Sequence, residues 1–411
     1  MNNWPTKKLG EICEEKKEKN VDNAKIPVFT VSHIYGLIQY QKIFYKQVHS
    51  RDTRNYKIVK CNDFAFGLPT KDTLPFGYLK SENEVLVSPA YTVFSIKDKN
   101  LLYPKFLFYL FKTEKYKWMV IEVAKSQSAT RHGLPLKFSH LENLEIPLPP
   151  LPIQRKIARI LDTIQSAIDI QEKIIEKIKE LKKSLMNLLF HYGPKALSIK
   201  LLASYRVGEL KSEELEKLGL KLKKTEIGEI PEDWEIIIFL KSLDKQFRFK
   251  VGKLKQRDYQ KDGEYPIIDQ GEKLIAGYSD DYDKVYQGDL PVVIFGDHTR
   301  VVKYVDFPFI VGGGGVKILK PNDNFDIKYF YYLLLNLDIE SRGYNRHFRI
   351  LKDKLIPLPP LSEQQEIAEI LQTVDQKIEI EKRKKELYEE LFKTMLNKIM
   401  KQEVDVELLD Y

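Results

Sequence analysis

The chain has 411 residues, of which 43% are hydrophobic and 11% aromatic, so it is long enough to form two or three folded domains with their own cores. Its formal net charge of +8, from 67 Lys and Arg against 59 Asp and Glu, favours a polyanionic partner only weakly. No segment approaches the roughly 18 uninterrupted apolar residues of a membrane helix, and the N-terminus lacks a signal-peptide core, which excludes membrane and secreted classes and predicts an intracellular protein.

The first half of the chain shows a mixed α and β pattern. Runs at 85–87 and 91–96 are rich in β-formers and predict strands, whereas 104–113 predicts a helix. Between and after these elements lie two polar loops, 66–77 and 124–133. They carry Thr70, Lys71, Gln127, Arg131 and His132, whose side-chain types can hydrogen-bond to phosphates and base edges, although ordinary surface-turn chemistry remains the alternative interpretation.

An internal repeat dominates the sequence. Residues 146–165 read IPLPPLPIQRKIARILDTIQ and residues 356–375 read IPLPPLSEQQEIAEILQTVD, so twelve of twenty positions are identical without a gap. The offset from Ile146 to Ile356 is 210 residues, about half of the chain. The repeat is therefore a duplicated domain-sized unit and not a solenoid array.

A long amphipathic helix is predicted after each repeated signature. The prolines stop any preceding helix, and Ser362 with Gln365 has the spacing of a capping box. Apolar residues then recur at steps of three, four or seven, and a helix over 153–190 would extend about 57 Å. The stripe weakens around Gln171 and from Glu381, where we expect looser or polar packing. Two long stripes in one chain most simply cover each other, which predicts an intramolecular coiled coil.

The second half echoes the first. After a charged connector at 193–228, strands are expected at 290–295 and 301–305 and a helix at 327–337. The fold class is therefore α+β, with two mixed α/β globular domains in tandem, each followed by a long helix.

Candidate DNA contacts are denser in the second half. Phosphate contacts need clustered Lys and Arg, and base edges suit Arg, Asn, Asp and Thr. The loops 243–261, 295–304 and 341–349 supply these types: Arg248, Lys250, Lys253, Lys255, Arg257, Asp297, His298, Thr299, Arg300, Arg342, Asn345, Arg346 and His347. A solvated charged hairpin remains an equal alternative for 243–261, and surface-turn chemistry remains the alternative for the residues of 295–304 and 341–349. An Arg-His pair precedes both signatures.

Enzyme motifs are mostly missing from the sequence. There is no GxxxxGK[ST] loop, no G-x-S-x-G elbow and no H-E-x-x-H helix. The run Gly312–Gly315 lies between two β-rich segments, so a bend is favoured over a phosphate cradle. Cys13 and Cys61 are too isolated to predict a disulfide framework or a zinc site.

The arrangement resembles the specificity subunit of a type I restriction-modification system. The resemblance covers essentially the whole chain and is carried by 146–162, 356–372 and the domain openings 4–12 and 225–236. The first signature departs from the family pattern, because Ile153 replaces the usual Glu. The family implies two target recognition domains, 1–150 and 229–360, whose helices, 151–192 and 361–403, pair antiparallel about a pseudo-twofold axis before a tail, 404–411.

The resemblance also implies partners. The subunit would be a non-catalytic protein of the prokaryotic cytoplasm that reads a bipartite, asymmetric double-stranded DNA site and docks two modification subunits and restriction subunits. No cofactor is expected in this chain, since S-adenosylmethionine, ATP and Mg²⁺ would belong to the partners. Expected docking and spacer residues are Gln154, Ile157, Ile164, Gln364, Ile367 and Val374. The alternatives are a coiled-coil scaffold or adaptor without a DNA role, and a single-chain DNA methyltransferase or nuclease.

Overall fold

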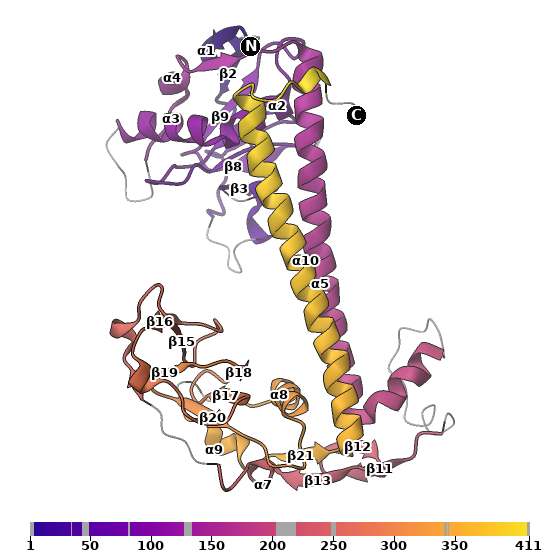
Figure 1. Ribbon diagram of the computed structural model, residues 1–411. Helices are drawn as coiled ribbons and strands as arrows, with labels where there is room; N and C mark the ends of the chain where they lie inside the picture. Colours follow the sequence, from indigo (N-terminus) through magenta and orange to yellow (C-terminus); the bar gives the residue numbers. More distant parts are fainter. Residues whose placement is uncertain are drawn as a thin grey trace. The chain divides into compact units, whose positions relative to one another are not determined.

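The computed structural model describes residues 4–33, 35–42, 49–80, 83–126, 134–202, 219–247, 252–340, 343 and 345–408. The chain forms two compact units, and the labelled elements of both are drawn in Figure 1. Unit 1 comprises Met1–Glu172 with Arg383–Tyr411, and unit 2 comprises Lys173–Lys382. Each unit thus contains one globular part and a length of both long helices.

Unit 1 is built on the antiparallel sheet β2-β9-β6-β7, with smaller pairs β1-β10, β3-β4 and β5-β8. Its core combines the sheet with two helices, and buried rings such as Phe64 and Phe94 stack 5.1 Å apart. The elements are β1 (Thr6–Lys8), α1 (Leu9–Ile12), β2 (Cys13–Lys16), β3 (Phe29–Ser32), β4 (Gly36–Gln39), η1 (Tyr40–Lys42), β5 (Lys57–Val59), β6 (Phe64–Phe66), β7 (Phe76–Tyr78), β8 (Val85–Val87), β9 (Thr92–Ile96), α2 (Pro104–Lys112), α3 (Glu114–Lys125), α4 (Phe138–Leu141) and β10 (Glu145–Pro147).

Unit 2 contains the four-stranded sheet β14-β19-β15-β16 and the three-stranded sheet β18-β17-β20, with pairs β11-β12 and β13-β21. The strands and helix expected at 290–305 and 327–337 are present as β17, β18 and α8. The elements are β11 (Leu222–Thr225), β12 (Gly228–Pro231), β13 (Glu235–Ile238), α7 (Phe239–Ser242), β14 (Lys253–Leu254), η2 (Gln256–Asp258), β15 (Tyr265–Ile268), β16 (Gly277–Ser279), η3 (Tyr282–Lys284), β17 (Val292–Gly296), β18 (Val302–Val305), β19 (Ile310–Gly312), β20 (Val316–Leu319), α8 (Ile327–Asn336), α9 (Phe348–Leu351) and β21 (Leu355–Leu358).

The repeated signature closes each globular part by a strand pair. In unit 1, β1 pairs with β10 so that Lys7 lies opposite Ile146. In unit 2, β13 pairs with β21 so that Ile237 lies opposite Ile356, which is the counterpart of Ile146 under the 210-residue offset. Ile146 and Ile356 are fully buried. The signature is therefore repeated because its strand, β10 or β21, pairs with an earlier strand, β1 or β13, and so closes each globular part just before the long helix.

Both long helices begin at the leucine that ends the signature: α5 spans Leu151–Leu202 and α10 spans Leu361–Met400, with the short η4 (Val406–Leu408) after it. The Pro360 carbonyl accepts from the Glu363 and Gln364 amides at 2.9 and 3.1 Å. The expected Ser362 N-cap is therefore wrong, because the helix starts at Leu361, two residues before the start that an N-cap at Ser362 would give, and Ser362 lies in its first turn. Helix α5 bends at Gly193, whose φ is 73°.

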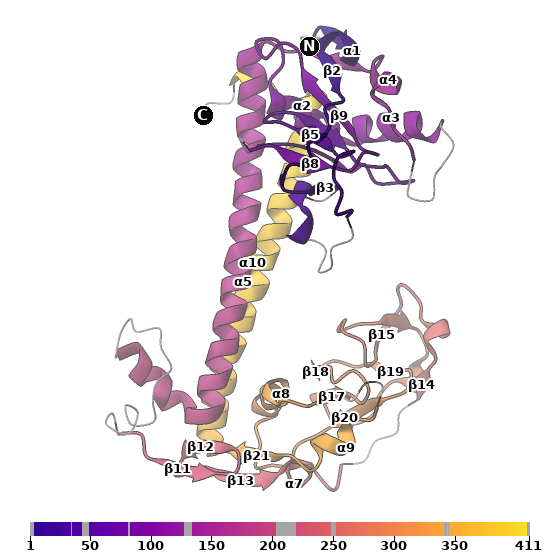
Figure 2. The same cartoon turned by 180° about the vertical axis from the view of Figure 1, so that it is seen from behind.

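The two helices run antiparallel, and they lie side by side in both Figure 1 and Figure 2. In unit 1, the start of α5 around Leu161 shares a core with the end of α10 around Leu396. In unit 2, Leu189 of α5 shares a core with Leu371 near the start of α10. Because the start of each helix meets the end of the other, the pairing is antiparallel, as the predicted fold class requires.

Polar residues interrupt the helix packing at the expected place. Gln171 and Glu381, which correspond under the 210-residue offset, are only 6% and 3% exposed. The Lys377 ammonium lies 2.6 Å from the Glu381 carboxylate.

Within the described residues, none of the helices is both long and apolar enough to cross a bilayer.

Candidate nucleic-acid interface

Several loops of unit 2 meet at one edge of its sheets. Strands β15 and β19 run parallel, so the residues after Ile268 and Gly312 emerge on the same side. Strand β17 delivers the turn 297–300 to that side, where the Asp297 amide donates to the Gly315 carbonyl at 2.7 Å. We call the residues 269–276, 297–300, 312–315 and 345–349 the recognition edge of unit 2.

Gln270 ties two parts of this edge together. Its side-chain oxygen accepts from the His298 amide at 3.2 Å, and its backbone carbonyl accepts from the Thr299 hydroxyl at 2.6 Å. Gln270 could not be predicted, because nothing in the local sequence distinguishes it from other loop residues. The contact fixes the 297–300 turn against the 269–276 loop.

Lys303, at a buried position of β18, holds the 269–276 loop by hydrogen bonds. Its side chain is 4% exposed, and its ammonium donates to the carbonyls of Asp269 and Lys273 at 2.8 and 2.5 Å. Burial lowers the pKa of Lys303, and the nearby Asp269 carboxylate opposes that effect. The signal that could have found it is strand alternation, since Lys303 occupies an inward position of β18 beside Val305.

Asp297 and His347 are structural residues of this edge and do not present their side chains to a ligand. They are 3% and 1% exposed. The Asp297 carboxylate accepts from the Phe348 amide at 2.9 Å, and its carbonyl accepts from the His347 amide and ring Nδ1 at 2.8 and 3.0 Å. Their predicted base contacts are corrected, because both side chains are used to hold 345–349 against the 297–300 turn.

The remaining predicted residues of unit 2 lie around this frame. Thr299, Arg300, Asn345 and Arg346 are exposed, and His298 is half-buried. The basic residues Lys253, Lys255 and Arg257 are also exposed and adjoin the edge, because β14 pairs with β19 and the Gly313 amide donates to the Leu254 carbonyl at 2.8 Å. The structure thus brings the three predicted loops together. Arg248, Lys250 and Arg342 lie outside the described residues.

Unit 1 presents a comparable but simpler pair of loops. Thr70 and Lys71 are exposed after β6, where the Thr70 and Thr73 hydroxyls lie 2.7 Å apart. The Leu134 amide donates to the Pro69 carbonyl at 2.9 Å, which joins the segment before α4 to this loop. Gln127, Arg131 and His132 lie outside the described residues. The backbone contact parallels the one between His347 and Asp297 in unit 2.

The repeated glutamines of the signatures clamp each long helix to its own unit. Gln154 Oε1 accepts from the Tyr103 amide at 2.8 Å, and its Nε2 donates to the Leu101 and Pro149 carbonyls at 2.9 and 2.8 Å. Gln364 repeats the pattern with Asp326, Asn324 and Pro359, each at 2.9 Å. Both glutamines are fully buried.

This burial corrects part of the docking prediction. Gln154, Ile157, Gln364 and Ile367 have no exposed surface, so a partner cannot touch them. Ile164 and Val374 are half-buried. The four buried residues belong to the packing of the chain itself, so a docking surface has to use other positions on the helices, whereas docking through Ile164 and Val374 stays a prediction.

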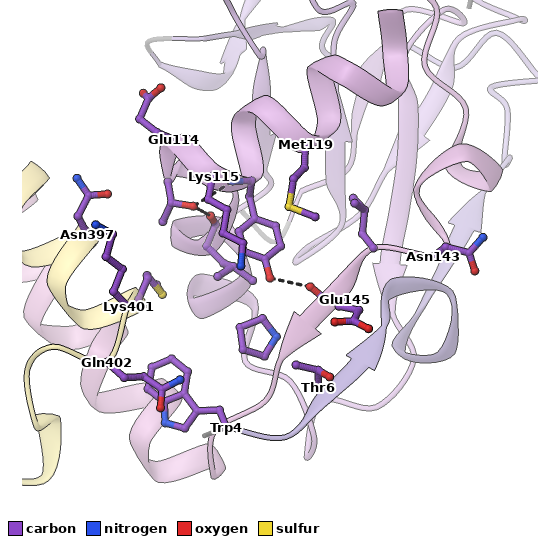
Figure 3. Close-up of a pocket in the computed structure, with 16 residues that line it drawn as sticks. Trp4, Thr6, Glu114, Lys115, Met119, Asn143, Glu145, Asn397, Lys401 and Gln402 are labelled. Carbon is purple, nitrogen blue, oxygen red and sulfur yellow. Dashed lines mark hydrogen bonds between the residues drawn. The ribbon is translucent and has the colours of Figure 1, made fainter. Parts of the chain in front are cut away.

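Unit 1 also contains a pocket of about 940 Å³ on the repeated frame (Figure 3). Trp4, Met119 and Glu145 line it together with residues from the end of α10 such as Lys401. The Tyr116 hydroxyl donates to the Glu145 carbonyl at 2.6 Å, and burial raises the pKa of Tyr116 to about 12. The pocket shares no lining residue with the 66–77 loop, so it is separate from the candidate interface.

Unit 2 fills the corresponding position with its own chain. Trp234, the counterpart of Trp4, is fully buried and donates from Nε1 to the Glu363 carboxylate at 2.9 Å. Lys195, just after the bend, lies 3.1 Å from the same carboxylate and has a raised pKa because of that contact. Glu363 is the position where the first signature has Ile153, so the departure noted in the sequence removes this contact from unit 1.

In the part of the chain that the structure describes, no three His, Cys, Asp or Glu side chains are placed together so that they could hold a metal ion. The fold and the surface instead define a class of protein. It is a recognition chain in which one α+β frame occurs twice, carries different polar loops in each copy, and is followed each time by a helix that pairs with its counterpart.

Comparison with known sequences places the chain within that class. A profile of the type I restriction modification DNA specificity domain matches residues 1–180 and 231–390, and the chain belongs to this family. Specificity subunits are non-catalytic, and the catalytic activities sit in partner subunits, so the chain is not itself an enzyme. Its partners are DNA and the other subunits of a restriction-modification complex.

Individual relatives agree with the family. The chain is 28% identical to a Methanocaldococcus jannaschii protein named for the specificity subunit of the type I restriction enzyme MjaX, over 98% of this chain and 94% of that protein. It is also 28% identical to the MjaVIII specificity subunit of the same organism, over 78% of this chain and 75% of that protein. The crystal structure of an S subunit from M. genitalium has the same fold, with a TM-score of 0.56, 17% identity, and 97% and 96% of the two chains covered.

Proposed function

We propose that the chain reads a bipartite, asymmetric DNA sequence, with each unit reading one half. The observation that carries this proposal is the repeated loop pair. In unit 1 the Leu134 amide ties the segment before α4 to the loop after β6, and in unit 2 the His347 amide ties the segment before α9 to the turn after β17. The frames correspond while the exposed loop residues differ, which suits two sites of one kind with different base preferences.

We assign the exposed loop residues to DNA contacts. Arg346 and Arg300 suit guanine, Asn345 suits adenine, and Thr70 and Thr299 suit a thymine methyl group. Lys253, Lys255 and Arg257 suit phosphates. Gln270 and Lys303 then act as positioning residues, because they hold the loops that carry these side chains.

The paired helices are proposed to set the gap between the half-sites. Half-sites on one face of DNA are about 34 Å apart per helical turn, and a continuous helix pair is a stiff means of fixing such a distance. Inserting whole helical turns into both α5 and α10 is then expected to lengthen the gap and to leave both half-site sequences unchanged.

Docking of two modification subunits is supported by exposed apolar residues that repeat along the helices. Ile170 and Ile380 correspond under the 210-residue offset and are 57% and 53% exposed. Leu181 and Leu391 also correspond and are 53% and 44% exposed. Exposed aliphatic residues at equivalent positions are typical of surfaces that bind two like partners. We place S-adenosylmethionine in these partners, and ATP with Mg²⁺ in restriction subunits.

The test is to express the chain with its modification subunit and map methylated adenines across the host genome. The proposal predicts one split motif with a fixed gap. A continuous short motif, or no motif although the complex forms and binds S-adenosylmethionine, would contradict it. A scaffold without a DNA role would yield no methylation pattern that depends on this chain.

Docking is tested separately by co-purification. Leu181→Glu together with Leu391→Glu should reduce recovery of the modification subunit, because a charge would be buried in the contact. Leu240→Glu is the control, since Leu240 is 50% exposed but lies on the short helix α7 of unit 2. Equal recovery with the helix variant and the control would refute this docking surface.

A further inference from the structure

A groove of about 1160 Å³ adjoins the recognition edge within unit 2. Four cationic side chains, Lys317, Arg346, Arg349 and Lys352, line it against two carboxylates, those of Asp297 and Asp353. None of the cations except Arg346 was singled out by the sequence. The groove begins where Asp297 leaves β17 and extends along α9.

The positive charges of this groove are available to a ligand. The Asp297 carboxylate already accepts a hydrogen bond from the Phe348 amide, and the Lys317 ammonium lies 3.9 Å from that carboxylate. Across the described residues, no ion pair engages Arg346, Arg349 or Lys352, and both arginines are exposed. A groove with excess positive charge attracts a polyanion, and DNA is the polyanion that this family recognises.

The charge of the groove is specific to unit 2. The counterparts of Arg346, Arg349 and Lys352 under the 210-residue offset are Leu136, Ser139 and Glu142. The helix that carries them, α9, nevertheless corresponds to α4 in length and position before the closing strand. The cations are therefore not needed to build the repeated frame, which points to a role in binding.

The glycine turn 312–315 beside the groove supplies an independent observation. Gly313 and Gly315 need glycine because their φ angles are 63° and 77°, and a Cβ on Gly312 would collide with the Tyr259 hydroxyl. Gly314 has neither requirement, since its φ is ordinary and a Cβ there would meet nothing within 4 Å. Among the glycines of the described residues, it is the one where neither a positive φ nor a close neighbouring atom within the chain explains the absence of a side chain. A remaining reason for glycine is close approach of another molecule.

We propose that Lys317, Arg349 and Lys352 of this groove form an electrostatic anchor for the phosphodiester backbone of DNA. The anchor holds the backbone without regard to base sequence while Arg346 keeps the guanine contact proposed above, and the backbone passes close to Gly314. This inference rests on the proposed function and deepens it. Unit 1 has no equivalent anchor at Leu136, Ser139 and Glu142. Unit 2 therefore supplies a larger share of the salt-dependent affinity than unit 1.

The experiment uses the full chain in complex with its modification subunit and a labelled duplex of scrambled sequence, titrated at several salt concentrations. Arg349→Ser with Lys352→Gln should make the slope of log K against log salt shallower by about 2, because two phosphates are no longer neutralised. Lys224→Ser is the control, because Lys224 is exposed on β11, away from the groove. A slope equal to that of the wild type, or a change no larger than that of the control, would overturn the anchor.

Two further measurements keep the inference falsifiable. Gly314→Leu should leave the melting temperature unchanged, because the space is empty, but weaken binding to the same duplex; unchanged binding would remove Gly314 from the interface. The methylation motif of the Arg349→Ser, Lys352→Gln complex should keep both halves, and an altered base in either half would show that the groove reads sequence. If the wild-type complex showed no salt-dependent binding at all, the proposed function would fail instead.

Discussion

Replacing Gln364 by leucine tests how each long helix is fixed to its globular part. The substitution keeps the side-chain size but removes three hydrogen bonds, to the Asp326 amide and to the carbonyls of Asn324 and Pro359. Asp326 is also the N-cap of α8, and its carboxylate accepts from the Lys328 and Tyr329 amides at 2.9 and 2.8 Å. The variant therefore disturbs a helix start as well as the clamp.

The expected loss of unfolding free energy depends on which hydrogen-bond partners of Gln364 stay buried in the variant. Asn324 is exposed and its carbonyl can bind water, whereas the Pro359 carbonyl is buried and the Asp326 amide is half-buried. An unpaired buried polar group costs about 1–3 kcal/mol, so the variant should lower the unfolding free energy by about 3 kcal/mol. For a unit of this size that corresponds to a melting temperature lower by about 6–12 °C.

Thermal unfolding of the full chain, followed by circular dichroism and calorimetry, measures the effect. Gln376→Leu is the matched control, since Gln376 is exposed on the same helix and should change the melting temperature little. Gln154→Leu should act on unit 1 as Gln364→Leu acts on unit 2. A Gln364→Leu shift no larger than that of the control would refute the clamp as a source of stability.

Three further outcomes are expected. Gly193→Ala should lower the unfolding free energy by about 1–3 kcal/mol, because φ is 73° and ψ is 179° there, whereas Gly314→Ala should be neutral in the same denaturant titration. Burial raises the pKa of Tyr116 and of Tyr331 to about 12, above the unfolded value near 10. The unfolding free energy is therefore at its full value below about pH 10 and falls as the pH rises toward 12, so tyrosinate absorbance should appear together with loss of helix. Ionisation of these tyrosines in a chain that stays folded would contradict this expectation. Lys303→Met should weaken DNA binding and speed amide hydrogen exchange in residues 269–276 with the rest unaffected, and unchanged exchange there would exclude a positioning role.

The repeated frame could be predicted from the sequence because its signals are local. Proline clusters and apolar periodicity defined the two long helices, and an identical signature 210 residues apart required two equivalent units. The helix start was predicted wrongly at Ser362, because the Pro360 carbonyl takes the first amides and moves the start to Leu361. The choice between two neighbouring starts depends on backbone geometry that the sequence does not display.

The candidate interface was predictable as loops but not as individual side chains. Asp297 and His347 were predicted to contact bases because their types suit base edges, yet the fold turns both inward to hold a neighbouring loop. Gln270 and the groove residue Arg349 were missed, because their roles depend on segments that are distant in sequence. Loop residues acquire their direction from tertiary partners, whereas a helix acquires its face from its own periodicity.

Whether each unit reads one half of a split DNA site can be tested by exchanging a loop of unit 2. Residues 341–349 would be replaced by the corresponding loop of a relative, and the methylated motif of the complex would be compared with that of the original chain. We expect one half of the motif to change while the other half and the gap stay the same. A change in both halves together, or a change in the gap alone, would contradict it.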